Sequence, residues 1–141
     1  MTTLLQPVGW TEAQLAAPGS DARLALRHCL LTDMPVRGRV VLAPAVGVPQ
    51  TFYAAFAEWL AARGLAVTTF DYRGHADSLQ GPLRQAKADL LDWAQDCLAV
   101  AQHLRALDAA EGLQRPVLWV GHSVGAQLPG LCRPALPVDG M

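Results

Sequence analysis

The sequence has little that would suit it to nucleic acids, metals or membranes. Its 141 residues carry a net charge of −1 and contain no run of Lys or Arg that would attract a polyanion. Its three cysteines are widely spaced and form no CxxC pair of the kind that holds zinc. No apolar run approaches the roughly 18 residues that a membrane span needs. We therefore expect no nucleic-acid partner, no metal site and no membrane span.

Targeting and nucleotide-binding signals are also lacking. Residues 1–10 do not pair a basic start with an apolar stretch, and the odd, scattered cysteines suit reduced thiols. A flavodoxin-like or nucleotide-binding domain would fit an alternating pattern, but there is no GxGxxG and no glycine-rich loop ending in Gly-Lys-Ser or Gly-Lys-Thr. With 52% hydrophobic and 16% charged residues, the chain is predicted to be one domain over residues 1–141 in the cytoplasm.

What the sequence does contain is an alternation of strand-like and helix-like stretches separated by Gly and Pro. The predicted strands cover 13–17 and 22–31 with a turn at 18–21, then 39–43, 65–70 and 117–120. The predicted helices cover 50–63 and, as a long amphipathic helix, 82–107. In the first helix Phe52, Phe56 and Trp59 recur at helical spacing and are expected in the core. Strand, helix and strand over 39–70 form a crossover unit, so the pattern predicts an α/β fold with parallel strands.

The last predicted strand runs directly into G-H-S-V-G at residues 121–125, with Ser123 at its centre. In a G-x-S-x-G turn the chain passes from strand to helix within a few residues and holds the serine in a strained conformation, which only flanking glycines leave room for. This favours Ser123 as a nucleophile. The alternative is that Gly121 and Gly125 are packing glycines and Ser123 is a helix N-cap.

The same turn aims a backbone N–H at the point where negative charge develops during attack on an acyl carbon. The Val124 N–H is one predicted oxyanion donor. The second is expected from the loop after the strand at 39–43, where we assign the Val46 N–H, with Ala45 as the neighbouring possibility.

Three stretches in this order resemble the α/β-hydrolase superfamily, and within it the serine aminopeptidase and monoacylglycerol lipase branch. They are V-V-L-A-P-A-V-G at 40–47, D-Y-R-G-H-A-D-S at 71–78 and the elbow at 121–125. Pro44 and Ala45 stand where many members have His-Gly, and Ala76 replaces a usual glycine. The resemblance implies the N-terminal part of an α/β-hydrolase fold, with a mostly parallel sheet flanked by helices and its C-terminal strands missing. It also implies a cofactor-free hydrolase acting on an ester or amide bond of a small-molecule acyl substrate.

The superfamily's acid and histidine follow the nucleophile in the chain. Here only 18 residues follow Ser123, and they contain one acidic residue, Asp139, and no histidine. The usual triad is therefore not expected within this chain, and hydrolase activity should be impaired. His75 follows a parallel strand and is a possible substitute base, with Asp71 or Asp77 to orient it.

Other polar residues are given structural roles. Asp71 and Arg73 are interpreted as a pair that stabilises the turn. His122 should point away from the nucleophile and pack or hydrogen-bond beneath the site, and His103 should lie on a solvated helix face. His28, in an early strand, has no evident partner.

Two further expectations concern the whole chain. The last predicted strand is apolar and would be an exposed sheet edge, which predicts self-association or marginal stability. A non-catalytic binding or interaction module that keeps the elbow is the alternative function.

Overall fold

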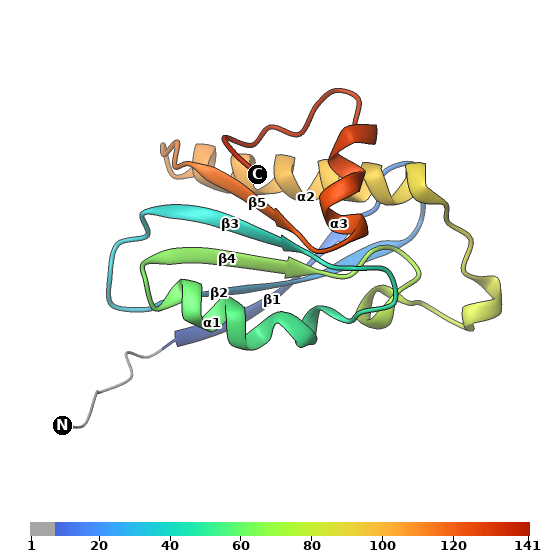
Figure 1. Cartoon of the computed structure of the whole chain (residues 1–141), viewed down its shortest axis with the longest axis horizontal. Coiled ribbons are helices and arrows are strands. Elements are labelled where there is room, and N and C mark those ends of the chain that lie inside the picture. Colours follow the sequence, from blue (N-terminus) through green and yellow to red (C-terminus); the bar gives the residue numbers. More distant parts are fainter. Residues whose placement is uncertain (1–7) are drawn as a thin grey trace.

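The computed structural model describes residues 8–141 as a five-stranded mixed sheet with helices on both faces (Figure 1). The strands are β1 (Val8–Ala16), β2 (Arg23–Leu31), β3 (Gly38–Ala43), β4 (Leu65–Phe70) and β5 (Val117–Gly121), in the order β1-β2-β4-β3-β5. The helices are η1 (Gln50–Tyr53), α1 (Ala54–Ala61), η2 (Ala76–Ser78), η3 (Leu83–Gln85), α2 (Leu90–Ala110), α3 (Val124–Gln127) and η4 (Leu128–Leu131).

The sheet has an antiparallel part and a parallel part. β1 and β2 form a hairpin in which Leu15 lies opposite Leu24, which confirms the two predicted strands and the turn between them. β1 begins earlier than predicted, at Val8. β2 continues antiparallel to β4, whereas β3 pairs in parallel with both β4 and β5. The ends of the three parallel strands therefore meet at one edge, which is where an α/β sheet binds ligands.

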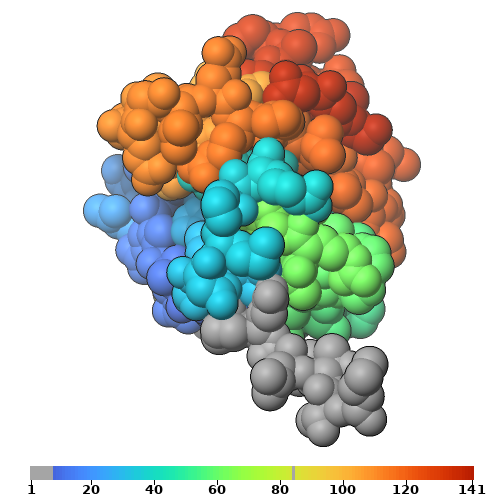
Figure 2. Space-filling model, turned by 90° about the vertical axis from the view of Figure 1, so that its left-hand side faces the viewer, coloured from blue at the N-terminus to red at the C-terminus, as the bar shows by residue number. Residues whose placement is uncertain are grey.

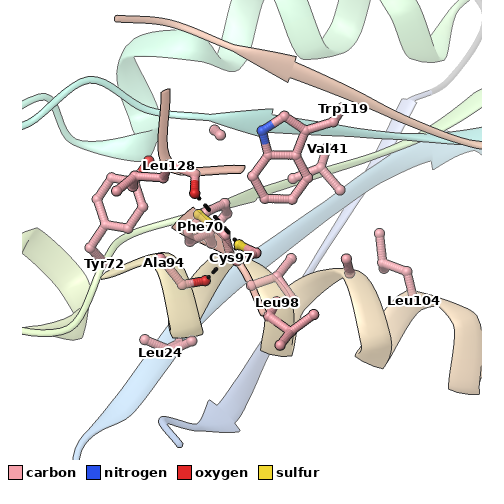
Figure 3. Close-up of a cluster of buried hydrophobic side chains, with 14 of the residues drawn as sticks. Leu24, Val41, Phe70, Tyr72, Ala94, Cys97, Leu98, Leu104, Trp119 and Leu128 are labelled. Carbon is pink, nitrogen blue, oxygen red and sulfur yellow. Dashed lines mark hydrogen bonds between the residues drawn. The ribbon is translucent and has the colours of Figure 1, made fainter. Parts of the chain in front are cut away.

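The core lies on both faces of the sheet. α2, together with α3 and η4, covers one face and α1 covers the other (Figure 1). Figure 3 shows the larger cluster, where Trp119 of β5 and Phe70 of β4 pack over Cys97 of α2. The Trp119 indole N–H donates to the Gly125 carbonyl at 2.9 Å, so the core is tied directly to the turn that follows β5. The three cysteines are free and buried, as the sequence indicated.

Phe52 of η1 and the aromatic residues of α1 are not in the core, so the sequence prediction for them was wrong. Phe52, Phe56 and Trp59 are 69%, 43% and 53% exposed, while Ala57 and Ala61 face the sheet. Small side chains on the inner face let the helix approach the strands closely, which leaves the bulky residues outside. Trp59 instead stacks beneath the Arg63 guanidinium, whose central carbon lies 3.5 Å from the ring centroid.

The long helix begins at Leu90 and not at Pro82, which corrects the predicted start. Asp89 accepts a hydrogen bond from the Asp92 N–H, and the Asp92 carboxylate accepts one from the Asp89 N–H. This reciprocal capping box satisfies two donors that a helix start leaves free. A proline is compatible with a helix start, but the capping residues decide where the helix begins.

The expected pair of Asp71 and Arg73 does not form. Arg73 binds Asp96 of α2, with Nη2 and Nε 2.7 and 2.9 Å from Oδ1 and the backbone N–H 2.9 Å from Oδ2. Asp71 accepts hydrogen bonds from the backbone and side-chain nitrogens of Gln50 instead. Both carboxylates are buried, and each is satisfied by an element distant in sequence.

The end of the sheet opposite the elbow is closed by another buried carboxylate. Figure 2 views the molecule from this end, where the connection before β3 (cyan) lies between the orange α2–β5 segment and the green start of β4. Asp108 of α2 binds both Arg39 and Arg115 there, each at 2.8 Å. Burial acts to raise the pKa of Asp108, but the hydrogen bonds from Arg115 and Arg39 outweigh it and lower that pKa to about 2.

β5 is partly covered at its outer edge. The Asp139 N–H donates to the Val117 carbonyl at 2.7 Å and the Trp119 N–H donates to the Gly140 carbonyl at 2.9 Å. The last residues thus run parallel to the first half of β5, and the edge is less open than the sequence predicted. Val120 remains 43% exposed on the α1 side of the sheet. Among residues 8–141, no helix combines the length and apolar character that crossing a membrane requires.

Candidate active site

The turn after β5 holds Ser123 in a backbone conformation that L-residues rarely adopt. Its φ is 55° and its ψ is −116°, between the end of β5 and the start of α3. Such strain persists only where the surrounding structure imposes it, and it is concentrated at functional sites. The Ser123 side chain is exposed and makes no capping hydrogen bond to α3. Ser123 thus stands at the N-cap position of α3, but its side chain does not cap the helix.

The glycines that flank Ser123 are required by close backbone approach. A Cβ on Gly125 would lie 2.3 Å from the Ala43 carbonyl oxygen, and a Cβ on Gly121 would lie 2.3 Å from backbone atoms of Gly125. No side chain can be accommodated at these distances. The His122 N–H also donates to the Ala43 carbonyl at 3.0 Å, so the turn is pressed against the end of β3.

The loop after β3 lies beside this turn and is held by two tyrosine hydroxyls. The buried Tyr72 hydroxyl donates to the Pro44 carbonyl at 2.8 Å. The Ala45 N–H donates to the Tyr53 hydroxyl at 3.0 Å. Both polar atoms of the Pro44–Ala45 peptide are thus engaged, and the Ala45 N–H is not free to bind a ligand.

The next residue in this loop differs in that respect. Val46 is 49% exposed, and within residues 8–141 neither its N–H nor that of Val124 donates a hydrogen bond to another group. Around Val124, the Gly125 N–H donates to the His122 carbonyl and the Ala126 N–H donates to the Ser123 carbonyl. Two backbone donors are therefore unused within residues 8–141, one in the loop after β3 and one at the start of α3.

A buried polar network anchors the far end of the loop. The Asp71 carboxylate accepts hydrogen bonds from the Gln50 N–H at 2.9 Å, from Gln50 Nε2 at 2.8 Å and from the Asp77 N–H at 3.3 Å. Thr69 donates to Gln50 Oε1 at 2.7 Å. Burial raises the pKa of Asp71, against the effect of these donors. Because Gln50 begins η1, the network fixes where the loop ends and the helix starts.

The four histidines lie in different surroundings. His75 is half-buried after β4, with Nδ1 3.1 Å from the Arg73 carbonyl and its ring 4.9 Å from that of Trp93. Neither Asp71 nor Asp77 orients it, which corrects that expectation, because Asp71 binds Gln50 and the Asp77 carboxylate faces Arg27 at 3.4 Å.

His122 forms a hydrogen bond, as expected, with Nδ1 2.8 Å from the Tyr53 hydroxyl. His28 has a partner that the sequence did not indicate, since its Nδ1 lies 2.9 Å from Thr68 Oγ1. His103 is half-buried with its ring 6.4 Å from that of His28, so it does not lie on a solvated face. Burial and the neighbouring His103 lower the pKa of His28 to about 4. Within residues 8–141 no cluster of His, Cys, Asp or Glu is suited to hold a metal ion.

Sequence reasoning missed Tyr53, Tyr72 and Gln50 as supports of the site. Tyr72 lies inside the D-Y-R-G turn and Gln50 stands at the start of a predicted helix, so their positions were visible. Their partners lie between 8 and 69 residues away in the chain, and no local pattern shows such contacts. Asp96 carried a weak signal, because it is a charge beside the apolar stripe of the long helix.

A strained serine after a parallel strand, between two glycines and beside the loop of the neighbouring strand, is the arrangement expected of an α/β-hydrolase elbow. Comparison with known proteins agrees. Residues 24–129 match the family described as serine aminopeptidase, S33, and the chain belongs to this family. No curated protein matches the sequence closely enough to count as a relative.

Solved structures show the same fold. A monoglyceride lipase from Saccharomyces cerevisiae is similar, with a TM-score of 0.68 and 21% identity over 85% of this chain and 38% of that one. A carboxyl esterase from Bacillus coagulans has a TM-score of 0.67 and 17% identity over 85% and 38%. An α/β serine hydrolase without a lid from Xanthomonas campestris has a TM-score of 0.66 and 19% identity over 89% and 56%. The chain thus covers less than two thirds of each of these structures.

Proposed function

We propose that this chain carries the nucleophilic half of a serine hydrolase site, with Ser123 attacking the acyl carbon of an ester or amide in a small molecule. The observation that carries the proposal is the strained backbone of Ser123, held between two glycines that admit no side chain. Strain of this kind presents a hydroxyl at the end of a strand instead of burying it in a helix cap. The family match supports the reaction class, and the chemistry needs no cofactor.

The proposed oxyanion hole consists of the Val46 and Val124 N–H groups. Both are unused within residues 8–141, while the Ala45 N–H is bound to Tyr53, which favours Val46 over its neighbour. Removing one such donor in serine proteases costs about 10²- to 10³-fold in rate. Together the two donors would stabilise the charge that forms when Ser123 attacks.

The proposed site also needs a general base to accept the Ser123 proton. Within residues 8–141 the hydrogen bonds of His28, His75 and His122 go to groups other than carboxylates. His75 remains our proposed substitute base. If its Nδ1–H donates to the Arg73 carbonyl, its Nε2 carries the free lone pair, and it follows β4 at the same sheet edge as Ser123.

This arrangement predicts acylation without efficient turnover. With p-nitrophenyl acetate, the chain should release about one nitrophenolate per molecule and retain an acetyl group on Ser123, because deacylation also needs a base. Intact-mass and peptide mass spectrometry would locate the adduct. Ser123→Ala should show no adduct at this peptide, and His75→Ala should acylate more slowly. An equal acetyl signal in Ser123→Ala would rule out the proposed nucleophile.

A second candidate is a non-catalytic interaction module, favoured by the apolar side chains that β5 leaves exposed. Leu118 and Val120 are 42% and 43% exposed on the α1 side, although the equivalent residues of β3 are buried. We propose self-association through this edge. The three free, buried thiols support the cytoplasmic location that we also propose.

A single charge on this edge should disrupt the association. The wild-type chain is expected to sediment increasingly as a dimer when its concentration is raised, and Val120→Lys should remain monomeric because a desolvated ammonium opposes contact. Leu113→Lys is the matched control, since Leu113 is 44% exposed in the α2–β5 connection. A wild-type chain that stays monomeric at every concentration would contradict the prediction.

A further inference from the structure

Tyr53 stands between the two parts of the proposed site. It is the last residue of η1, and α1 begins immediately after it, so its backbone is fixed by a helix junction. Its hydroxyl lies 3.0 Å from the Ala45 nitrogen and 2.8 Å from His122 Nδ1. Its ring meets that of His122 edge to face, with centroids 5.8 Å apart.

Proton accounting orders these contacts. The Ala45 N–H can only donate, so the Tyr53 oxygen accepts that bond. The hydroxyl proton is then available to His122 Nδ1, which accepts it when the ring proton lies on Nε2. In that case the hydrogen bonds run in one direction, from the Ala45 N–H to the Tyr53 hydroxyl and from the hydroxyl to His122 Nδ1.

Each end of this series of hydrogen bonds adjoins a group of the proposed site. Ala45 immediately precedes Val46, and His122 immediately precedes Ser123. We propose that Tyr53 is a positioning residue that locks the loop after β3 to the elbow and so fixes the Val46 N–H relative to Ser123. The catalytic part of this inference rests on the proposed function of Ser123.

The opposite side of the same loop has its own hydrogen bond, from Tyr72, but that bond does not reach the elbow. Tyr72 holds the Pro44 carbonyl, but Tyr72 follows β4 and makes no contact with His122 through its hydroxyl, which is committed to Pro44. Tyr72 therefore anchors the loop to the core, whereas within residues 8–141 Tyr53 is the one side chain that hydrogen-bonds to both the loop and the elbow. Loss of Tyr53 should free the Ala45–Val46 segment while leaving the Pro44 carbonyl in place.

Tyr53→Phe tests this directly, because it removes only the hydroxyl. We expect amide hydrogen exchange at Ala45 to become about tenfold faster, in line with the loss of one hydrogen bond. The ¹⁵N spectrum of His122 should change from the Nε2–H tautomer to a mixture. Labelling of Ser123 by a fluorophosphonate should slow by about tenfold.

Two further variants separate positioning from general damage. His122→Asn places an acceptor oxygen near the position of Nδ1 and should keep the Ser123 labelling rate close to wild type, whereas His122→Ala should match Tyr53→Phe. Trp59→Phe, on the exposed side of α1, is the aromatic control. It should change neither the Ala45 exchange rate, nor the His122 spectrum, nor the Ser123 labelling rate. Far-UV circular dichroism of each variant confirms that it is folded.

The outcomes are distinguishable. Unchanged Ala45 exchange and an unchanged His122 tautomer in folded Tyr53→Phe would show that the Tyr53 hydroxyl does not link the loop to the elbow. A tie that is lost in Tyr53→Phe without any change in the Ser123 labelling rate would overturn the positioning role. A wild-type chain that is not labelled at Ser123 would overturn both the proposed function and the positioning role, even if the exchange data show the tie to exist.

Discussion

Gly125→Ala is expected to destabilise the fold by about 3 kcal/mol, the upper part of the range for overpacking. The added methyl would lie 2.3 Å from the Ala43 carbonyl oxygen and 2.8 Å from its carbon. Both are backbone atoms at the end of a central strand, so neither can rotate away as a flexible side chain could. Equilibrium urea unfolding followed by far-UV circular dichroism should show a much lower midpoint, or a chain already unfolded without urea.

Gly130→Ala is the matched control for this substitution. A Cβ on Gly130 meets no atom within 4 Å, and its backbone does not require glycine. Its free energy of unfolding should stay within about 1 kcal/mol of wild type. Equal stability of the two variants would show that α3 does not pack against β3 as described.

Asp96→Ala is expected to cost about 3 to 5 kcal/mol, the usual result of removing one partner of a buried ion pair. Asp96 is fully buried and receives the side-chain and backbone donors of Arg73, whose own side chain is 7% exposed. The substitution would leave a buried guanidinium whose remaining carboxylate partner is the part-exposed Asp92, 3.9 Å from Nη1. It should also loosen the turn after β4, because the Arg73 N–H loses its acceptor.

Asp77→Ala removes a carboxylate from an exposed pair and serves as the comparison. Its Oδ2 lies 3.4 Å from Arg27, and both side chains contact solvent. The loss should be no more than about 1 kcal/mol. The double variant Arg73→Met with Asp96→Leu should lose less stability than Asp96→Ala, since it leaves no charge buried. If Asp96→Ala and Asp77→Ala lose the same free energy, the buried pair is not an important contact.

The strands and the elbow could be predicted because their determinants are local. Continuous apolar runs at 40–43 and 117–120 mark strands, although the second run is buried on one face only, and the glycines around Ser123 mark a turn that needs close backbone approach. The order of the three motifs then indicated the family. For each strand and for the elbow, the decisive information lies within about ten residues.

The errors arose where distant contacts decide the structure. Helical spacing placed Phe56 and Trp59 on a stripe, but the closeness of α1 to the sheet is set by Ala57 and Ala61, which turn the aromatics outward. Arg73 lies two residues from Asp71 and yet binds Asp96, because α2 crosses beside the turn. Sequence proximity is a poor guide to pairing when a helix supplies a buried carboxylate.

The candidate site divides in the same way. Ser123 and its two glycines belong to one short motif, whereas the supports of the neighbouring loop come from η1 and from the turns after β4 and β5. The place of Val46 after a strand is what predicts it as an oxyanion donor. We propose Val46 over Ala45 because the Tyr53 hydroxyl already accepts the Ala45 N–H.

We expect the elbow to present Ser123 as a nucleophile although, within residues 8–141, no histidine is hydrogen-bonded to a carboxylate. The most direct measurement is fluorophosphonate labelling of the purified, folded chain beside Ser123→Ala, with mass spectrometry to identify the modified residue. We expect slow labelling confined to Ser123, reflecting the residual acceleration of about 10³- to 10⁴-fold over water that remains in serine proteases after loss of the triad. Folded wild-type protein that stays unlabelled, or is labelled equally in Ser123→Ala, would contradict the account.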